Sequence, residues 1–263
     1  MLYRQCHSND VFVSPRFVPQ QLANTIVITQ KTGIIAVAVV ICTNLVLLPD
    51  RVLQDFVVRA ALVQSVPLYL LTDTLVPERY GEDGSLVRFL ADGENFVKVS
   101  PIYIGEEWYV PKRYVKVLPD TTHFIKTIMI DRRDQNIMTL EQTGEAQWTV
   151  RSMNPATTGR HRPPYAQETP LGIFVLQEKK TRMVFLKDGS TATGGFAPYA
   201  SRFSDGGYIH GVPVNEPRKA LIEYSPSLGT TPRSHMCVRN ATSHSKFIFD
   251  WAPVNETIIF VLE

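Results

Sequence analysis

Short alternating runs of apolar and polar residues fill much of this chain, and they constrain its fold more than any other feature. Between about 60 and 118, the runs at 86–90 and 96–99 are separated by Asp92-Gly93. Alternation with a period of two, bounded by Gly and Asp, predicts strands that are joined by tight turns. We therefore expect a small β-barrel at 60–118.

Longer strand-like runs follow a polar boundary at about 119–122. The runs at 124–130 and 136–140 begin a predicted meander, and the chain closes on another apolar run. Only 240–251 has a clear helical pattern, in which Asn240 is placed to cap the first turn. The second predicted unit, 121–263, is thus mainly β with one or two short helices.

The charge balance narrows the classes of partner. Lys and Arg total 27 against 25 for Asp and Glu, which gives a formal charge of +2. Such a chain has no broad positive field with which to bind a phosphate backbone, so we expect no nucleic acid partner.

The cysteines suggest a free thiol. Cys6 and Cys42 lie in the N-terminal fifth, whereas Cys237 stands alone near the other end. This spacing indicates no disulfide framework.

The N-terminal segment, 1–59, contains an uncharged apolar stretch at 33–48. One interpretation is a signal core or membrane anchor, which places the protein in the cell envelope, outside the cytoplasm. The stretch is shorter than the roughly 20 residues that span a bilayer comfortably. The alternative is a pair of buried strands, because Val and Ile dominate it.

The strongest chemical signal surrounds Cys237. Ser234 and His235 precede it closely, Arg239 follows it, and His210 lies upstream. A thiol becomes a good nucleophile as the thiolate, which a neighbouring imidazole or a helix N-terminus stabilises. His210 and His235 offer the imidazole, and the position of Cys237 just before the predicted helix offers the helix N-terminus.

Other side chains complete this candidate site. Arg239 is suited to a substrate carboxylate, which a guanidinium binds through two parallel hydrogen bonds. Tyr208 lies two residues before His210, so an extended strand would project both to one side. Packing in the core is an equally good reading of Tyr208.

Two plainer readings compete with catalysis. A lone free cysteine is often an inert buried residue. His210, His235 and Cys237 also have the chemistry of three zinc ligands, but no paired His-x-x-His or Cys-x-x-Cys motif supports them. We therefore expect no metal.

Three ordered blocks resemble the L,D-transpeptidase family. His210-Gly211 and Ser234-His235-Met236-Cys237-Val238-Arg239 are similar to its His-Gly pair and its Ser/Thr-His-Gly-Cys block. Thr169-Pro170-Leu171-Gly172-Ile173-Phe174 is similar to its TPxGxF run, and Thr157-Thr158-Gly159 precedes it. The resemblance covers about 123–263 and implies a β-sandwich catalytic domain. The ending Trp108-Tyr109-Val110-Pro111 gives the smaller unit a resemblance to bacterial SH3-like domains.

The resemblance implies a role for each matched residue. Cys237 would be the nucleophile, His210 the general base held by the backbone around Gly211, and His235 a polar neighbour of the oxyanion site. Arg239 would meet the donor peptide, with Tyr208, Gly211, Ser234 and Met236 beside the substrate. The implied partners are peptidoglycan stem peptides and carbapenem-type inhibitors, and no cofactor is required.

Two departures from the family pattern are visible. Met236 occupies the position of a glycine, so its backbone conformation should be one that a side chain tolerates. The spacing from His210 to Ser234 is also enlarged, which we interpret as a loop insertion at about 214–224 that shapes or covers the site.

The implied reaction is attack on a tetrapeptide stem followed by transfer of the acyl group to an amine, in cell-wall cross-linking or remodelling that affects cell shape. Water in place of the amine gives an L,D-carboxypeptidase or a wall peptide hydrolase. A non-catalytic peptidoglycan-binding protein is the alternative from another class.

Overall fold

The computed structural model describes residues 36–41, 44–49, 60–62, 65–72, 76–101, 106–119, 122–144 and 147–263. Within these residues, strands dominate and α2 (Thr242–Trp251) is the single α-helix. The prediction of a mainly β chain is confirmed.

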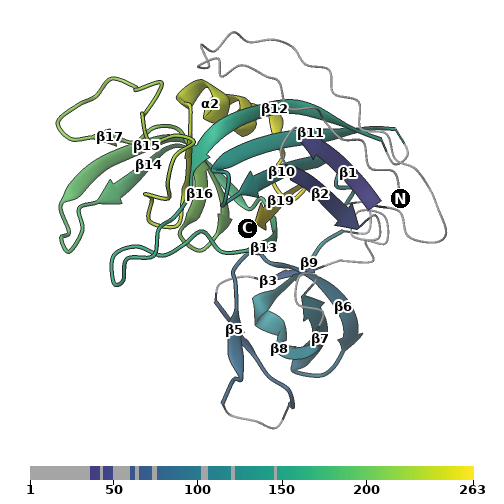
Figure 1. Ribbon diagram of the computed structural model, residues 1–263. Helices are drawn as coiled ribbons and strands as arrows, with labels where there is room; N and C mark the ends of the chain where they lie inside the picture. The colour runs from purple at the N-terminus through teal and green to yellow at the C-terminus, as the bar shows by residue number, and fades with distance from the viewer. Residues whose placement is uncertain are drawn as a thin grey trace.

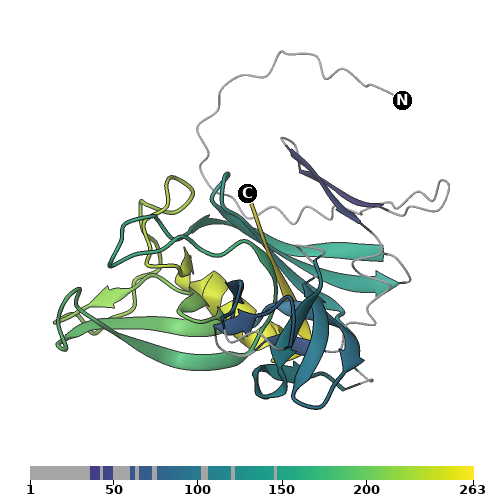
Figure 2. The ribbon, with the colours of Figure 1, turned by 90° about the horizontal axis from the view of Figure 1, so that it is seen from below.

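One large curled sheet forms most of the C-terminal unit (Figures 1 and 2). Its order is β13-β19-β10-β11-β12-β18-β16-β15-β14, and β17 pairs with β15. The strands are β10 (Lys126–Asp131), β11 (Asn136–Gly144), β12 (Gln147–Thr157), β13 (Gly172–Val175), β14 (Glu178–Leu186), β15 (Thr193–Ser204), β16 (Gly207–His210), β17 (Val214–Asn215), β18 (Val238–Asn240) and β19 (Thr257–Leu262).

The middle of this sheet is buried on both faces. Along β10, Ile128 and Ile130 belong to one buried apolar cluster, whereas Met129 belongs to another. Successive side chains of a strand point to opposite faces, so β10 separates two cores. This explains the continuous apolar run at 128–130.

The last strand, β19, lies inside the large sheet. β19 pairs in parallel with β10 and antiparallel with β13. The C-terminal run therefore joins segments that are remote in sequence, and it lies at the centre of both cores.

A smaller β unit precedes the large sheet (Figure 1). It has a five-stranded sheet in the order β8-β7-β6-β3-β9 and a separate β4-β5 pair. Its elements are β3 (Ala60–Leu62), β4 (Val66–Leu68), β5 (Arg79–Gly81), β6 (Leu86–Asp92), β7 (Phe96–Pro101), β8 (Trp108–Pro111), the 3-10 helix η1 (Lys112–Tyr114) and β9 (Val115–Val117). The strands expected at 60–118 are present; the SH3-like assignment and the domain boundaries stay predictions.

The helix was predicted correctly, but its first turn was not. α2 begins at Thr242, two residues after the predicted start, and Asn240 lies in β18. The Asn240 side chain accepts a hydrogen bond from Ser245 instead of capping the helix. The Glu223 carboxylate accepts bonds from the Ser243 backbone N–H and hydroxyl, so a distant loop supplies the cap.

The apolar stretch at 33–48 contains the antiparallel strands β1 (Ala36–Ile41) and β2 (Asn44–Pro49). This backbone matches the strand alternative. No described helix is long and apolar enough to cross a membrane. Targeting and localisation stay predictions, and Cys6 and Cys42 lie outside the described residues.

Candidate active site

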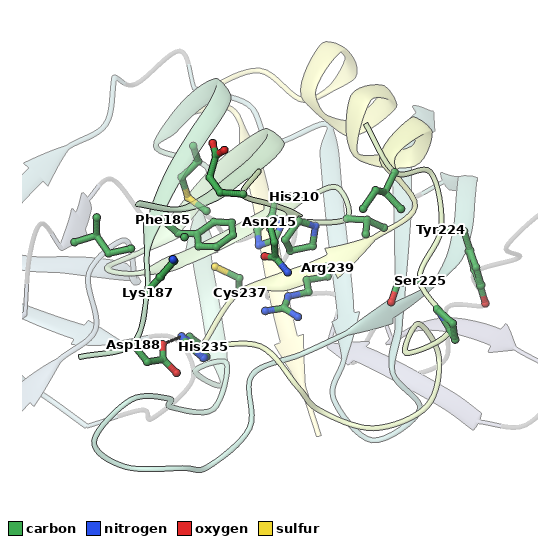
Figure 3. A pocket seen from close by; sticks show the side chains of 18 residues that line it. Phe185, Lys187, Asp188, His210, Asn215, Tyr224, Ser225, His235, Cys237 and Arg239 are labelled. Atoms are coloured by element: carbon green, nitrogen blue, oxygen red, sulfur yellow. Dashed lines mark ion pairs between the residues drawn. The ribbon is translucent and has the colours of Figure 1, made fainter. Parts of the chain in front are cut away.

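A pocket of about 800 Å³ contains the predicted cysteine and both predicted histidines (Figure 3). Three segments line it: the β14–β15 hairpin, the stretch 210–226 and the stretch 235–239. The lining residues are Met183, Phe185, Leu186, Lys187, Asp188, Gly194, His210, Val212, Pro213, Asn215, Glu216, Ile222, Tyr224, Ser225, Pro226, His235, Cys237 and Arg239.

The pairing of β16 with β18 brings the site together. These strands are parallel, with His210 opposite Arg239. Cys237 comes two residues before Arg239, so side chains at these positions face the same side of the sheet as His210. Figure 3 shows Cys237, His210 and Arg239 directed into one cavity. The topology thus brings together His210 and Cys237, which are 27 residues apart in the chain.

His210 is held by the backbone, as the resemblance implied. The side chain is buried, and its Nδ1 lies 2.7 Å from the Gly211 carbonyl oxygen. Because a carbonyl only accepts, Nδ1 must carry the proton and Nε2 is left with a lone pair. Burial and, to a smaller extent, the Arg239 charge lower the pKa of His210 to about 4, against the opposing effect of the Gly211 bond. The resting imidazole is therefore neutral.

Cys237 is held by the turn between β15 and β16. Its thiol donates to the Gly206 carbonyl at 3.3 Å. Burial raises the pKa of Cys237, while the Tyr208 backbone N–H and the Arg239 cation oppose that rise. Burial is the larger influence, so the resting sulfur is a thiol.

The prediction that the helix N-terminus favours a thiolate at Cys237 is wrong. β18 separates Cys237 from the start of α2 at Thr242. The first-turn N–H of Ser243 already faces the Glu223 carboxylate. Because the field of a helix end falls off within about one turn, Glu223 receives it rather than the thiol.

Arg239 and Lys187 are the cations of the pocket lining, and a second arginine lies near Arg239. Burial lowers the pKa of Arg239, and the charge of Arg160 lowers it as well, against the effect of Cys237. The buried Nε of each arginine has no hydrogen-bond partner among the described residues. Arg160 and Arg239 are remote in the sequence, so their proximity arises from the tertiary fold.

The other matched residues occupy different depths. His235 is partly exposed, and its Nδ1 lies 3.5 Å from the Asp188 carboxylate across the pocket. Ser234 is buried, and its hydroxyl donates to the Cys237 carbonyl. Tyr208 lies in β16 and directs its backbone N–H at the Cys237 sulfur. Its hydroxyl accepts a hydrogen bond from Lys180 Nζ at 3.5 Å. The pocket lining does not include Tyr208.

Met236 has a backbone conformation that favours glycine. Its φ is +84°, so the expectation of a conformation that suits a side chain is not met. The carbonyl of Met236 accepts a 2.7 Å hydrogen bond from the Thr169 hydroxyl, which itself accepts from the Gly159 N–H at 2.8 Å. Hydrogen bonds therefore link the segments 157–159, 169–174 and 234–239 beside the cysteine.

The predicted insertion does border the site. Asn215, Glu216, Ile222 and Tyr224 all line the pocket. The opposite wall, which includes Phe185 and Asp188 from the β14–β15 hairpin, was missed because alternating strand residues carry no chemical signature. No cluster of metal-ligating side chains exists among the described residues.

Comparisons with known proteins address the family. A family model described as the L,D-transpeptidase catalytic domain, YkuD, matches residues 125–261. No curated protein matches the sequence.

Several solved structures resemble the fold at low similarity. An L,D-transpeptidase from Mycobacterium smegmatis is 14% identical, with a TM-score of 0.41 and coverage of 92% of this chain and 99% of that one. A Xylanimonas cellulosilytica L,D-transpeptidase is 20% identical, with a TM-score of 0.37 and coverage of 54% and 62%. A fused Zn-dependent amidase/peptidase/peptidoglycan-binding protein from Clostridium acetobutylicum is 18% identical, with a TM-score of 0.37 and coverage of 52% and 51%. The chain thus spans about half the length of this last protein.

The family match runs from β10, the first strand of the large sheet, nearly to the chain end. It includes all three segments that line the pocket. Because it covers more than half of the 263 residues, the chain belongs to the L,D-transpeptidase (YkuD) catalytic domain family.

Proposed function

We propose that this protein is a peptidoglycan L,D-transpeptidase of the cell envelope, in which Cys237 is the nucleophile and His210 the general base. One observation carries this proposal. The pocket contains a thiol and an imidazole whose Nδ1 is fixed by the Gly211 carbonyl, leaving Nε2 to take a proton.

In the first half of the reaction, the Cys237 sulfur attacks the carbonyl carbon of the L,D amide in a tetrapeptide stem. Its proton passes to Nε2 of His210, and the carbonyl oxygen becomes an oxyanion. When the C–N bond breaks, the amine of the terminal D-amino acid takes that proton from His210. A thioester on Cys237 and a neutral His210 result.

In the second half, an acceptor amine attacks the thioester and gives a proton to His210. The C–S bond breaks, the sulfur recovers the proton, and a new amide joins the two stems. Atoms and charge balance without a metal or a cofactor. Water in place of the amine would give the hydrolase outcome.

Arg239 favours an anionic group of the donor peptide beside it. Arg239 lines the cavity, and its Nε has no partner among the described residues. A carboxylate of the stem peptide would supply two acceptor oxygens to this guanidinium and offset its desolvation. We assign His235 a place beside the developing oxyanion, together with the backbone of Met236.

A carbapenem tests the nucleophile. Its strained cyclic amide should acylate Cys237, so intact-mass analysis should show an adduct on the parent protein and none on Cys237→Ala. His210→Gln removes the base but keeps a side chain of similar size, and should slow adduct formation by about 10²–10⁴-fold. A folded parent that forms no adduct would favour the non-catalytic binding protein.

Product analysis tests transfer. Tetrapeptide stems incubated with the enzyme and an amine acceptor should yield L,D cross-links, detected by separating the muropeptides and weighing them. Shortened stems alone would replace this proposal with a hydrolase.

A further inference from the structure

A turn of the small β unit sits directly on the large sheet. Residues 82–85 join β5 to β6, and Asp83 is only 3% exposed there. The Gly84 carbonyl accepts a 3.0 Å hydrogen bond from the Val175 N–H, and Ser85 forms a β-bridge with Phe174. The two units are thus joined by backbone contacts as well as side chains.

Asp83 is the polar centre of this contact. Its Oδ2 accepts from Arg202 Nη1 at 2.6 Å and from Gln177 Nε2 at 3.0 Å. Gln177 Nε2 also lies 2.8 Å from the Phe203 carbonyl oxygen. One amide group therefore connects a carboxylate of the small unit to the backbone of β15.

Gly84 shows how close the two backbones are. Its φ is +78°, and a Cβ placed on it would lie 2.0 Å from the Phe203 carbonyl oxygen. Only glycine satisfies both the conformation and the space. The turn at 82–85 therefore packs onto the last residues of β15.

The end of β15 leads straight to the cysteine. Ser204 pairs with Gly207, which closes a turn over Asp205 and Gly206. The Gly206 carbonyl accepts from the Cys237 thiol at 3.3 Å, and the Tyr208 N–H also bonds the sulfur. This β15–β16 turn thus contacts Cys237 from one side. Phe203, just before the turn, is held by Gln177, which is itself bonded to Asp83.

We propose that the small β unit positions the nucleophile: Asp83, acting through Gln177, fixes the β15–β16 turn that holds the Cys237 sulfur. This inference rests on the proposed role of Cys237. Asp83 and Gln177 are positioning residues, because neither touches the sulfur or lines the pocket.

Electrostatics agrees with this placement. Burial raises the pKa of Glu82, and the negative charges of Asp205 and Asp83 raise it further. Glu82 therefore belongs to the same junction as the β15–β16 turn. The attraction between Asp83 and Arg202 holds the junction together in spite of these like charges.

The direction of the functional effect follows from the Tyr208 N–H. A donor to sulfur stabilises the thiolate and lowers the pKa of Cys237. If the turn loosens, the thiol loses its bond to the Gly206 carbonyl and the sulfur loses the Tyr208 N–H. The Tyr208 N–H has the larger influence on the pKa of Cys237, so that pKa rises and less thiolate is present at a given pH. The rate at which a small electrophile captures Cys237 should therefore fall.

The chain offers a matched control at another contact between the units. Lys116 Nζ, in β9, donates to Asn255 Oδ1 at 2.8 Å. Asn255 lies between α2 and β19 in the chain, outside the β15–β16 turn. Lys116→Ala removes an inter-unit hydrogen bond without touching the polar junction at Asp83.

The test measures alkylation of Cys237 by iodoacetamide in the full chain, followed on the peptide that contains this cysteine, between about pH 6 and pH 10. Asp83→Ala and Gln177→Ala should each slow capture by about fivefold or more near neutral pH and move the midpoint of the profile upward. Lys116→Ala should stay within about twofold of the parent. The double variant Asp83→Ala/Gln177→Ala should show less than the sum of the two effects.

Thermal unfolding of each variant checks that the fold is retained. If Asp83→Ala does not fold, Gln177→Ala decides, because it leaves the Asp83–Arg202 ion pair in place. Unchanged profiles in folded variants, or equal slowing in Lys116→Ala, would overturn the inference. Iodoacetamide needs no peptide recognition, so a parent that gives no carbapenem adduct but shows these shifts would defeat the proposed function and leave this inference standing.

Discussion

Met236 gives the sharpest test of backbone strain beside the nucleophile. Its φ of +84° lies in the left-handed region, at a position where the family pattern has glycine. Two substitutions separate backbone from side chain. Met236→Ala and Met236→Gly both remove the contacts of the long side chain, but only glycine relieves the conformation.

The expected difference follows from two opposing contributions. An L-residue in the left-handed region costs roughly 1–2 kcal/mol. Glycine loses more backbone freedom on folding, which costs roughly 0.5–1 kcal/mol relative to alanine. Met236→Gly should therefore be more stable than Met236→Ala by about 1 kcal/mol.

Urea unfolding followed by tryptophan fluorescence measures this difference, since Trp148 is buried in the core of the large sheet. Equal slopes of free energy against urea would show that the midpoint shift reports stability. If Met236→Ala proved as stable as Met236→Gly, or more stable, the strain assigned to this position would be refuted. Loss of the Met236 sulfur, which lies near Gly206, cannot explain a difference between the two variants, because both variants lose that sulfur.

Two further predictions concern the residues that support the site. A Cβ on Gly159 would lie 2.4 Å from the Gln167 carbonyl oxygen and 2.7 Å from the Met236 Cα, so Gly159→Ala should lower the free energy of unfolding by about 1–3 kcal/mol. Gly144→Ala, whose Cβ would meet only a flexible glutamine side chain, should cost less in the same urea assay, and equal losses would contradict the reasoning. Burial lowers the pKa of His244 from 6.5 to about 4, so the unfolded chain binds the proton more readily and stability is lost as pH falls from 6.5 toward 4, by up to about 1.4 kcal/mol per pH unit. His244→Gln should flatten that slope in urea titrations at several pH values, and an unchanged slope would count against the neutral buried imidazole.

Local patterns in the sequence predict several strands of the large sheet, but not β15, its longest strand. The run at 136–140 corresponds to β11, and the turn before it follows Asp131, the last residue of β10, whose carboxylate accepts from the Asp134 N–H. Alternation and turn chemistry are local, so they can be read from neighbouring residues. The insertion of β19 between β10 and β13 is not local, and no pattern in the sequence announces it.

The same distinction applies to the site. Cys237, His210 and Arg239 could be singled out because their chemistry is unusual and their motifs are ordered along the chain. Glu223 could not, because its role at the start of α2 depends on a loop that folds back to the helix. Asn240 has the local preference for a cap, but its place in β18 overrides that preference.

The resting charge state of the pocket bears on how the proposed nucleophile is activated. A thiolate–imidazolium pair would bury two charges, and burial disfavours the charged form of both His210 and Cys237. The neutral pair avoids that cost until the substrate is bound. Proton transfer to His210 then has to accompany attack, and the Tyr208 N–H and the Arg239 charge favour the sulfur anion as it forms. Activation in this pocket therefore depends on geometry held ready by the surrounding strands, more than on a thiolate stored in advance.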